Sequence, residues 1–339
     1  MQKLFIDNFD ESGDGMKKWY TGVVHSHTTR SDGNLSPAEL VKKAEDIGLD
    51  FIMITDHDVF CDEIPESKKV LVIPGTELSV SGKGHTNIWG AKRPFADFNC
   101  ESYEKWESKI AEARENGAVI CINHPHCSQC GWHWPLEPEK ADCIELWNSP
   151  QHTDNMICAE WWQNELRAGK KIPAVGGSDF HRDYYVAAKL DNPVTLVYAE
   201  ECTQDAILTA IKEGHTTISP KVGGQRITLF SGEHIIGDTV KLSTQTTVTV
   251  CVNVLKKGQT LKVIDDSGVK FTYKAEKTGY YYVTLPVEQA GFICAQVEYD
   301  LHPLYAAVYG KVEQKILHSK HKGKLPPFIY SQSGAIYFE

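Results

Sequence analysis

The sequence of 339 residues lacks the features of an exported or membrane-bound protein. No run of about 18 apolar residues occurs, and the opening segment MQKLFIDNFDESGDGMKKWY has no apolar core of the signal-peptide type. Low-complexity linkers and internal repeats are absent as well. We therefore expect a globular protein that stays in the cytoplasm and does not enter a membrane.

Basic residues are scarce relative to acidic ones. The chain has 35 Lys and Arg against 45 Asp and Glu, and its formal net charge is -10. A protein whose main partner is nucleic acid needs a basic face that neutralises phosphates. We therefore predict that nucleic acid is not the main partner. A small anionic substrate is compatible with this charge, because bound metal ions would dominate the local field.

A disulfide framework is also missing. The 10 cysteines are scattered through a chain too large to need covalent staples, so we interpret them as reduced thiols that lie mostly in the core. The pair Cys127-x-x-Cys130 is a lone CxxC, which is weak evidence for a zinc or redox site. Packing within a loop is the favoured interpretation of this pair.

The first two thirds of the chain alternate short apolar runs with helix patterns, which is typical of parallel β/α units. In the segment SPAELVKKAEDIG, Ser36 is the predicted N-cap, Pro37 takes the first helical position and Glu39 completes a capping box. The next apolar run, FIMIT at 51–55, fits a strand covered on both faces. The predicted fold class is α/β, with a barrel-like array of parallel strands.

The pattern changes after Ser219. Short alternating runs such as TTVTVCVNV, GYYYVTL and FICAQVEYD follow one another without helix patterns, which predicts a small antiparallel sandwich. We therefore divide the chain into a barrel domain, residues 1–219, and a small C-terminal all-β domain, residues 220–339. The second domain could also mediate oligomerisation.

Imidazoles and carboxylates gather where the predicted strands end, which is where parallel β/α folds carry their active sites. His25 and His27 end the first strand, and residues two apart on a strand share a face. The other residues at such positions are Asp32, His57, Glu77, His85, His124, His126, Asp179 and His181.

This mixture of ligands suits divalent zinc, manganese or iron. A carboxylate can bridge two cations, which makes Glu77 and Asp179 the natural bridging residues. Closely spaced cations acidify a bound water to hydroxide and offset the charge that builds on an attacked phosphoryl or acyl group. The sequence therefore predicts a metal-dependent hydrolase.

Six segments in this order resemble the motifs of the PHP superfamily, named for polymerase and histidinol phosphatase: HSHTTRSDG, ITDHD, PGTELS, GHTNIWG, INHPH and GGSDFH. The segment ELWN near Asn148 and the context of GGSD resemble the CehA/McbA-like branch of metallohydrolases. The resemblance covers roughly residues 19–219 and leaves the tail uncovered.

The resemblance implies a distorted (β/α)7 barrel that holds two or three divalent metal ions. By position, the first ion would be held by His25, His27, Glu77 and Asp179; the second by Glu77, His85 and His124; and the third by Asp32, His57 and His181. It further implies hydrolysis of a small phosphorylated metabolite or nucleotide by a bridging hydroxide. We assign Asp179, Glu77 and His181 to the catalytic set.

Loop residues near these ligands are predicted to bind the non-reacting substrate oxygens, namely Arg30, His126, Asn148 and Arg182. A second interpretation keeps the metals but changes the bond, to a carbamate or carboxylic ester. The two arginines favour phosphate, since a neutral ester would not need them. A third interpretation, a metal-stabilised binding module, predicts eroded ligands, and no ligand position is missing.

Overall fold

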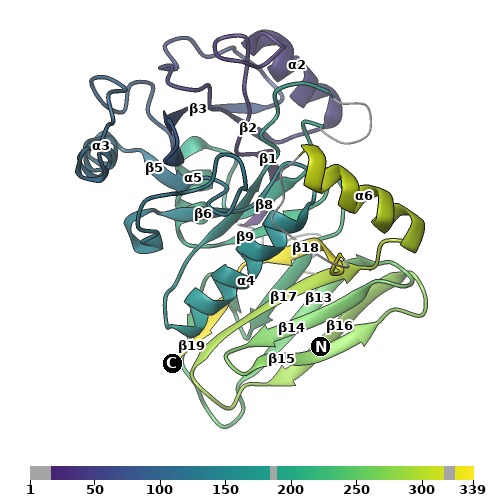
Figure 1. The fold of residues 1–339 in the computed structure, drawn as a ribbon. Helices are drawn as coiled ribbons and strands as arrows, with labels where there is room; N and C mark the ends of the chain where they lie inside the picture. The colour runs from purple at the N-terminus through teal and green to yellow at the C-terminus, as the bar shows by residue number, and fades with distance from the viewer. Residues whose placement is uncertain (1–16, 184–188, 317–324) are drawn as a thin grey trace.

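A mixed sheet with helices packed around it makes up the α/β part of the protein and lies in the upper half of Figure 1. The computed structural model describes residues 17–183, 189–316 and 325–339. Strands of the α/β part lie side by side in the order β9-β8-β1-β2-β3-β4-β5-β6-β7. Their bounds are Lys18–Val23 (β1), Phe51–Ile54 (β2), Leu71–Val80 (β3), Gly84–Trp89 (β4), Val119–Ile122 (β5), Cys143–Asn148 (β6), Ala174–Gly177 (β7), Val194–Ala199 (β8) and Thr216–Ser219 (β9).

The sheet contains two parallel groups. Strands β1, β2 and β3 pair in parallel, and so do β5, β6 and β7. The α/β class with parallel strands is thus confirmed. The seven-fold (β/α) repeat is not, because β4 runs antiparallel to both of its neighbours and β8 antiparallel to β1. Only residues 81–83 connect β3 to β4, far too few for the crossover that a parallel pair requires.

The two ends of this curved sheet approach each other, because β7 contacts both β8 and β9. The hydroxyl of Thr195 on β8 accepts a hydrogen bond from the Gly176 amide on β7 at 2.9 Å and donates one to the Gly176 carbonyl at 2.8 Å. A β-branched hydroxyl here takes the place of a backbone ladder between β7 and β8. The sheet therefore curls back on itself, which brings the ends of β1, β2, β5 and β7 together.

Four helices are present among the described residues of the α/β part and pack on individual strands. They are α2 (Pro37–Ile47) on β2, α3 (Tyr103–Glu115) on β5, α4 (Thr153–Arg167) on β6 and α5 (Gln204–Lys212) on β8, and a short 3-10 turn, η1, spans Pro138–Lys140. The predicted capping box of α2 forms between Ser36 and Glu39, and Gly48 ends that helix with φ of 79°.

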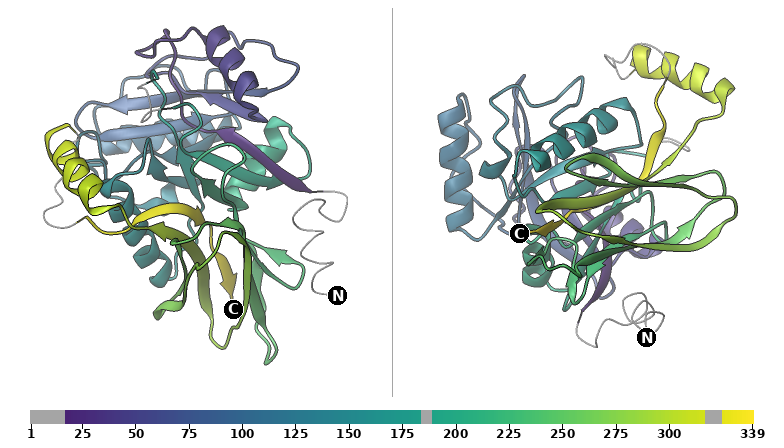
Figure 2. Two further views of the ribbon diagram at one scale, coloured as in Figure 1. Left: turned by 90° about the vertical axis from the view of Figure 1, so that its right-hand side faces the viewer. Right: turned by 90° about the horizontal axis from the view of Figure 1, so that it is seen from below.

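The β-rich C-terminal part is confirmed and forms a sandwich, seen in the lower half of Figure 1 and edge-on in Figure 2. One sheet has the order β11-β10-β13-β16. Leu229 and Val250 of this sheet share one buried cluster with Val263 and Ala295 of the other. The bounds are Ile227–Ser231 (β10), His234–Ile235 (β11), Thr239–Val240 (β12), Thr247–Leu255 (β13), Thr260–Asp265 (β14), Gly268–Lys274 (β15), Gly279–Pro286 (β16), Gly291–Tyr299 (β17), Phe328–Ser333 (β18) and Ile336–Phe338 (β19).

The expectation of an all-β tail is wrong for one segment, the helix α6 (Pro303–Ile316). Its sequence PLYAAVYGKVEQKI begins with Pro at the first helical position and is rich in strong helix formers. It also lacks the alternation of the neighbouring strands. The Tyr309 hydroxyl donates to the Gln151 carbonyl at 2.7 Å, which ties this helix to the segment before α4.

The second sheet of the sandwich continues the sheet of the α/β part. Strand β18 pairs antiparallel with β9, so backbone hydrogen bonds cross the predicted boundary between residues 219 and 220. The division into residues 1–219 and 220–339 stays a prediction. Among the described residues, no helix has the length and apolar character needed to cross a membrane.

A glycine allows β1 and β2 to pair around a buried aromatic ring. Gly22 lies opposite Phe51, and a Cβ on Gly22 would lie 2.3 Å from that ring. We expect Gly22→Ala to lower the free energy of unfolding by about 1–3 kcal/mol through overpacking. Gly279→Ala, where nothing lies within 4 Å, should change it by less than about 0.5 kcal/mol. Denaturant unfolding followed by circular dichroism measures both, and equal effects would contradict the packing argument.

Candidate metal centre

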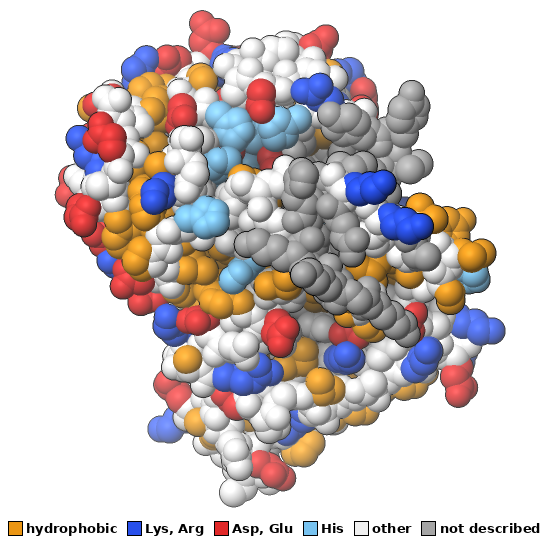
Figure 3. All heavy atoms as spheres, in the orientation of Figure 1, with side chains coloured by type: hydrophobic (Ala, Val, Ile, Leu, Met, Phe, Trp, Pro, Cys, Tyr) orange, Lys and Arg blue, Asp and Glu red, His pale blue; other side chains and the backbone are white. Residues whose placement is uncertain are grey.

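Imidazoles from four strand ends converge on one face of the α/β part, where Figure 3 shows histidine side chains gathered. His25 and His27 follow β1, His57 follows β2, His124 follows β5 and His181 follows β7. The His27 ring is central, because its centroid lies 4.3 Å from that of His57 and 4.2 Å from that of His181. The topology thus brings together residues that are distant in sequence.

Glu77 on β3 lies at the middle of this cluster and is fully buried. Its Oε2 atom lies 3.3 Å from His25 Nε2, 3.4 Å from His27 Nε2 and 2.8 Å from His57 Nδ1. A single carboxylate oxygen therefore faces three imidazoles.

The other oxygen of Glu77 faces a second group. Oε1 lies 3.1 Å from His85 Nδ1 and 3.5 Å from His124 Nε2, and it accepts a hydrogen bond from Asn123 Nδ2 at 2.7 Å. His85 reaches this place because β4 pairs antiparallel with β3. The two oxygens of Glu77 thus point at two different sets of imidazoles, as a bridging carboxylate would.

Asp179 closes the cluster from the end of β7. Its Oδ1 lies 3.0 Å from His27 Nε2 and 3.4 Å from His25 Nε2. Its Oδ2 accepts a hydrogen bond from Asn148 Nδ2 at 3.3 Å. The backbone of Asp179 has φ of 48°, a left-handed conformation that is strained for a residue with a side chain and is common at functional sites.

An outer group opens to solvent. Asp32 Oδ1 lies 3.2 Å from His181 Nε2 and 3.9 Å from both His57 Nε2 and His27 Nδ1, and the Asp32 side chain is 56% exposed. His181 Nδ1 donates to the Asp179 carbonyl at 2.8 Å. That bond leaves His181 Nε2 as the lone-pair atom that faces Asp32.

Buried polar atoms without hydrogen-bond partners show that these residues fit cations. The set includes His25 Nε2, both ring nitrogens of His27, Glu77 Oε2 and Asp179 Oδ1. Leaving such atoms unsatisfied costs about 1–3 kcal/mol each, so native structures rarely do it. Donor atoms that bind one ion at about 2.1 Å lie roughly 3–3.5 Å apart, which matches the separations given above.

All nine predicted metal residues take part in this arrangement. Three groups of donor atoms, each within 4.8 Å of one another, cover seven of them: His27 with Asp32, His57 and His181; His25 with His27 and Glu77; and His57 with Glu77 and His85. His124 joins His85 and Cys130 in a further group. The assignment of individual ligands to individual ions stays a prediction.

Glu145 is a buried carboxylate that the sequence analysis missed, and it contacts two of the predicted ligands. Glu145 on β6 lies with its Oε1 2.9 Å from His25 Nδ1, and its Oε2 accepts from the His124 amide and from Asn148 Nδ2, both at 3.0 Å. Such a carboxylate fixes the orientation and tautomer of a ligand imidazole. The sequence does contain a signal for this residue, because Glu145 is the one charged residue in the apolar run CIELWN.

A second carboxylate shapes the loop between His27 and Asp32. Asp56 accepts hydrogen bonds from the amide and hydroxyl of Thr28, both at 2.7 Å, and from the Ser31 hydroxyl at 2.7 Å. Asp58, by contrast, accepts a hydrogen bond from the Ser79 amide at 2.9 Å and so contacts the backbone of β3.

The four predicted substrate residues lie in different settings. The Asn148 amide donates to Glu145 and Asp179, so it positions the Asp179 carboxylate. Arg30 is half-buried, and its Nη1 lies 4.0 Å from the Cys61 sulfur. Arg182 is exposed. His126 packs on Trp161 with a ring separation of 5.1 Å, and its Nε2 is buried without a hydrogen bond. Their contact with substrate stays a prediction.

Electrostatics inside the cluster follow from the competition between burial and charge. Burial opposes protonation of His124, but the carboxylates of Glu77, Glu145 and Asp179 outweigh it and raise its pKa to about 9. The same competition raises the pKa of His25 well above its usual value. Burial lowers the pKa of His27, whereas neighbouring imidazoles hold the pKa of Glu77 and Asp179 well below the usual range against the effect of burial. In the absence of cations, protons therefore neutralise part of the cluster.

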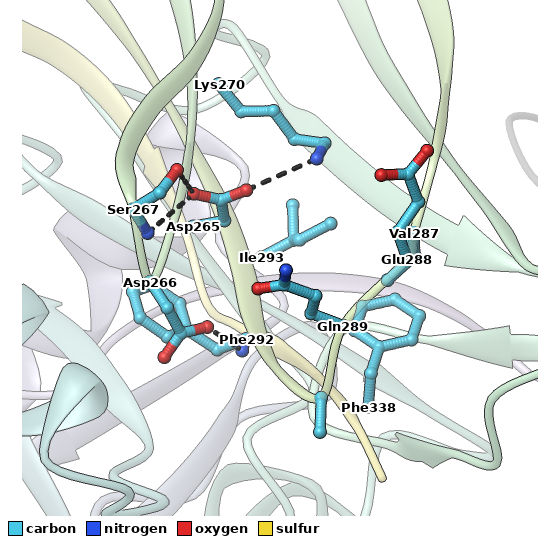
Figure 4. A pocket seen from close by; sticks show the side chains of 11 residues that line it. Asp265, Asp266, Ser267, Lys270, Val287, Glu288, Gln289, Phe292, Ile293 and Phe338 are labelled. Atoms are coloured by element: carbon cyan, nitrogen blue, oxygen red, sulfur yellow. Dashed lines mark hydrogen bonds and ion pairs between the residues drawn. The ribbon is translucent and has the colours of Figure 1, made fainter.

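A cavity in the sandwich has a different character. It encloses about 210 Å³ beside β14 and β17, and Figure 4 shows the Asp265 carboxylate paired there with Ser267 and Lys270. No imidazole lines it. None of the residues that line it carries a buried polar atom without a hydrogen-bond partner, which sets this cavity apart from the imidazole cluster.

Parts of the chain are similar in sequence to known proteins. No family model matches the chain. The 5'-3' exoribonuclease Rnm of Salmonella typhimurium is 34% identical over 112 residues, and that of Escherichia coli is 41% identical over 69 residues. These matches cover 28% and 18% of this chain. They span 38% and 24% of the relatives, which is less than half the length of each.

A solved structure from Bacteroides vulgatus shows the fold. It is a two-domain protein containing a predicted PHP-like metal-dependent phosphoesterase, with 17% identity and a TM-score of 0.50, and the match covers 83% of this chain and 90% of that one. The α/β part and the β-rich part of this chain thus share a fold with a PHP-like protein. The CehA/McbA-like branch stays a prediction.

One prediction is contradicted, namely that nucleic acid is not the main partner. Both curated relatives are 5'-3' exoribonucleases, although they match over short segments. The prediction was drawn from the net charge of -10, which averages over the whole chain. The surface next to a metal cluster is not described by that average.

We expect Glu145→Gln to weaken binding of divalent cations by about 10- to 100-fold, because the neutral amide holds His25 and His124 less firmly. Competition against a chromophoric chelator measures the affinity. Glu115→Gln, on the exposed end of α3, is the matched control and should leave it unchanged. Equal affinities for all three proteins would show that Glu145 does not support the ligands.

Cation affinity should also depend on pH in a defined direction. Since the pKa of His124 is raised to about 9, its ring is protonated at neutral pH in the metal-free protein, and a cation must displace that proton. Affinity should therefore rise toward pH 9 and fall in acid, by about tenfold per pH unit for each proton displaced. Calorimetric titrations in buffers of different ionisation enthalpy count the protons released, and His124→Gln should release one fewer. A flat profile between pH 6.5 and 9 would contradict this assignment.

Proposed function

We propose that this protein is a PHP-type phosphoesterase that depends on two or three divalent cations. The observation that supports the proposal most directly is the set of buried, mutually facing donor atoms on His25, His27, Glu77 and Asp179 that lack hydrogen-bond partners. When bound, the cations lower the pKa of water and offset charge on the attacked phosphoryl group. Zinc, manganese and iron all suit the donor set.

In this proposal, Glu77 and Asp179 would be the carboxylates that the cations share, and the imidazoles would divide among the cations. His25 and His27 would hold the first, His85 and His124 the second, and Asp32, His57 and His181 the third. Glu145 and Asn148 restrict the side chains of these ligands. Together they keep the buried donor atoms aimed at one place, which is the preorganisation that electrostatic catalysis requires.

The outer group offers a place for proton transfer. His181 is partly exposed, its Nδ1 donates to the Asp179 carbonyl, and its Nε2 faces the open side next to Asp32. An imidazole fixed in this way can bind a cation or hold a proton for the leaving oxygen. Arg30, His126 and Arg182 are proposed to contact the non-reacting oxygens of the substrate.

The proposed substrate is a phosphoester of a nucleotide or of an RNA end. The exoribonuclease relatives support the inclusion of RNA. A carbamate or carboxylic ester is the second candidate, since the same cations would serve it. Arg30 and Arg182 favour the phosphoester, because guanidinium groups pair with anionic oxygens. We further propose that residues 1–219 carry the chemistry and that residues 220–339 mediate association.

Asp179→Asn should lower turnover by about 100- to 1,000-fold, because one of the two charges that hold cations in common is lost. The assay follows metal content and the hydrolysis of a phosphomonoester, a phosphodiester, a 5'-phosphorylated RNA oligonucleotide and a carboxylic ester. Asp183→Asn, which breaks the exposed pair with Lys43, is the control and should retain activity. Ester cleavage without phosphoester cleavage would favour the second candidate. A fully metallated protein inert toward the whole panel would contradict both.

A further inference from the structure

The loop after β5 brings a thiol to the second cation position. Cys130 Sγ lies 3.6 Å from His124 Nδ1, and one donor atom each of His85, His124 and Cys130 lie within 4.8 Å of one another. We propose that the Cys130 thiolate is a direct ligand of the cation held by His85 and His124. This inference rests on the proposed function, because it assumes that the cluster binds cations.

The backbone of this loop holds the thiol in place. The Cys127 amide donates to the His124 carbonyl at 2.9 Å, and the Gly131 amide donates to the Cys127 carbonyl at 3.1 Å. A Cβ on Gly131 would lie 2.4 Å from the Cys127 carbonyl oxygen, so the tight turn requires glycine there. Ser128 anchors the turn to α4 through the Asp154 carboxylate, with its amide at 2.8 Å and its hydroxyl at 3.0 Å.

The neighbouring thiol is placed differently. Cys127 Sγ accepts the amides of Gln129 and Cys130, both at 3.4 Å, and lies 3.2 Å from Cys130 Sγ. Cys127 is not part of the donor group. One sulfur of the CxxC therefore serves the backbone of the turn, whereas the other faces an imidazole. This asymmetry supplies a matched control for the proposed ligand.

The donor set explains which cation this position would prefer. Two imidazoles and a thiolate make three donors with one soft sulfur, which suits zinc and disfavours manganese. On binding, the S–H bond of Cys130 breaks, a sulfur–metal bond forms, and the proton passes to the solvent. The other two positions hold only nitrogen and oxygen donors, so the centre would combine cations of different kinds.

Cobalt(II) alone is the probe that tests this ligand. Chelator-stripped, fully reduced protein is titrated with Co²⁺ while its near-ultraviolet absorption is recorded. We expect a thiolate-to-cobalt charge-transfer band in the unaltered protein and in Cys127→Ser, and its loss in Cys130→Ser. Zinc affinity of one position should fall by about 10- to 100-fold in Cys130→Ser, whereas the other positions still bind.

The outcomes separate the two proposals. Cobalt that binds in full without the sulfur band, or a band lost in Cys127→Ser instead, overturns the Cys130 ligand and leaves the phosphoesterase proposal standing. A protein that binds no cobalt overturns the metal centre itself. If Cys130→Ser does not fold, alkylation of the unaltered protein followed by peptide mass mapping decides the matter. Zinc should protect Cys130 from the reagent, and equal labelling with and without zinc overturns the proposal.

Discussion

The buried carboxylate of Glu77 is the constraint on which the α/β part depends. A carboxylate removed from water costs several kcal/mol unless charges and donors surround it. Five imidazoles do so here, and they come from the ends of β1, β2 and β5 and from the start of β4. Strand β4 runs antiparallel to β3 because the connection between them is short, and this direction also serves the cluster. It delivers His85 to the side of Glu77 that the parallel strands leave open.

Backbone strain gathers at the same place. His124 and Asp179 have φ of 28° and 48°, and Asp58 and Ser149, which lie close to other parts of the cluster, also adopt positive values. Each such residue costs about 1–3 kcal/mol and persists only where its surroundings enforce it. Glu145 holds the His124 amide, and Asn148 holds the Asp179 carboxylate. The supporting hydrogen bonds thus offset the strain that aims the ligands inward.

The sequence predicts the ligands because their positions obey local rules, whereas the supporting residues depend on tertiary packing. Histidines two apart at a strand end share a face, and the capping box of α2 needs only four residues. Glu145 becomes a partner of His25 only once β6 lies beside β5 and β7. Cys130 reaches His124 only through the turn at Gly131. Helix α6 is a single helix between β17 and β18, and the alternation of the surrounding segments predicts strands for the whole tail.

The prediction from net charge failed for a similar reason, because it did not take the local arrangement of charges into account. The formal net charge of -10 describes the whole chain, but a bound substrate meets only the local field. Asp32, Glu77 and Asp179 carry negative charge, as do Glu145 and the proposed Cys130 thiolate, and the charge of three divalent cations exceeds the charge of these five groups. An acidic protein can therefore present a locally positive centre to a phosphoester. A substrate class that binds through one phosphoryl group leaves no signature in overall composition, and so the argument from net charge could not exclude RNA.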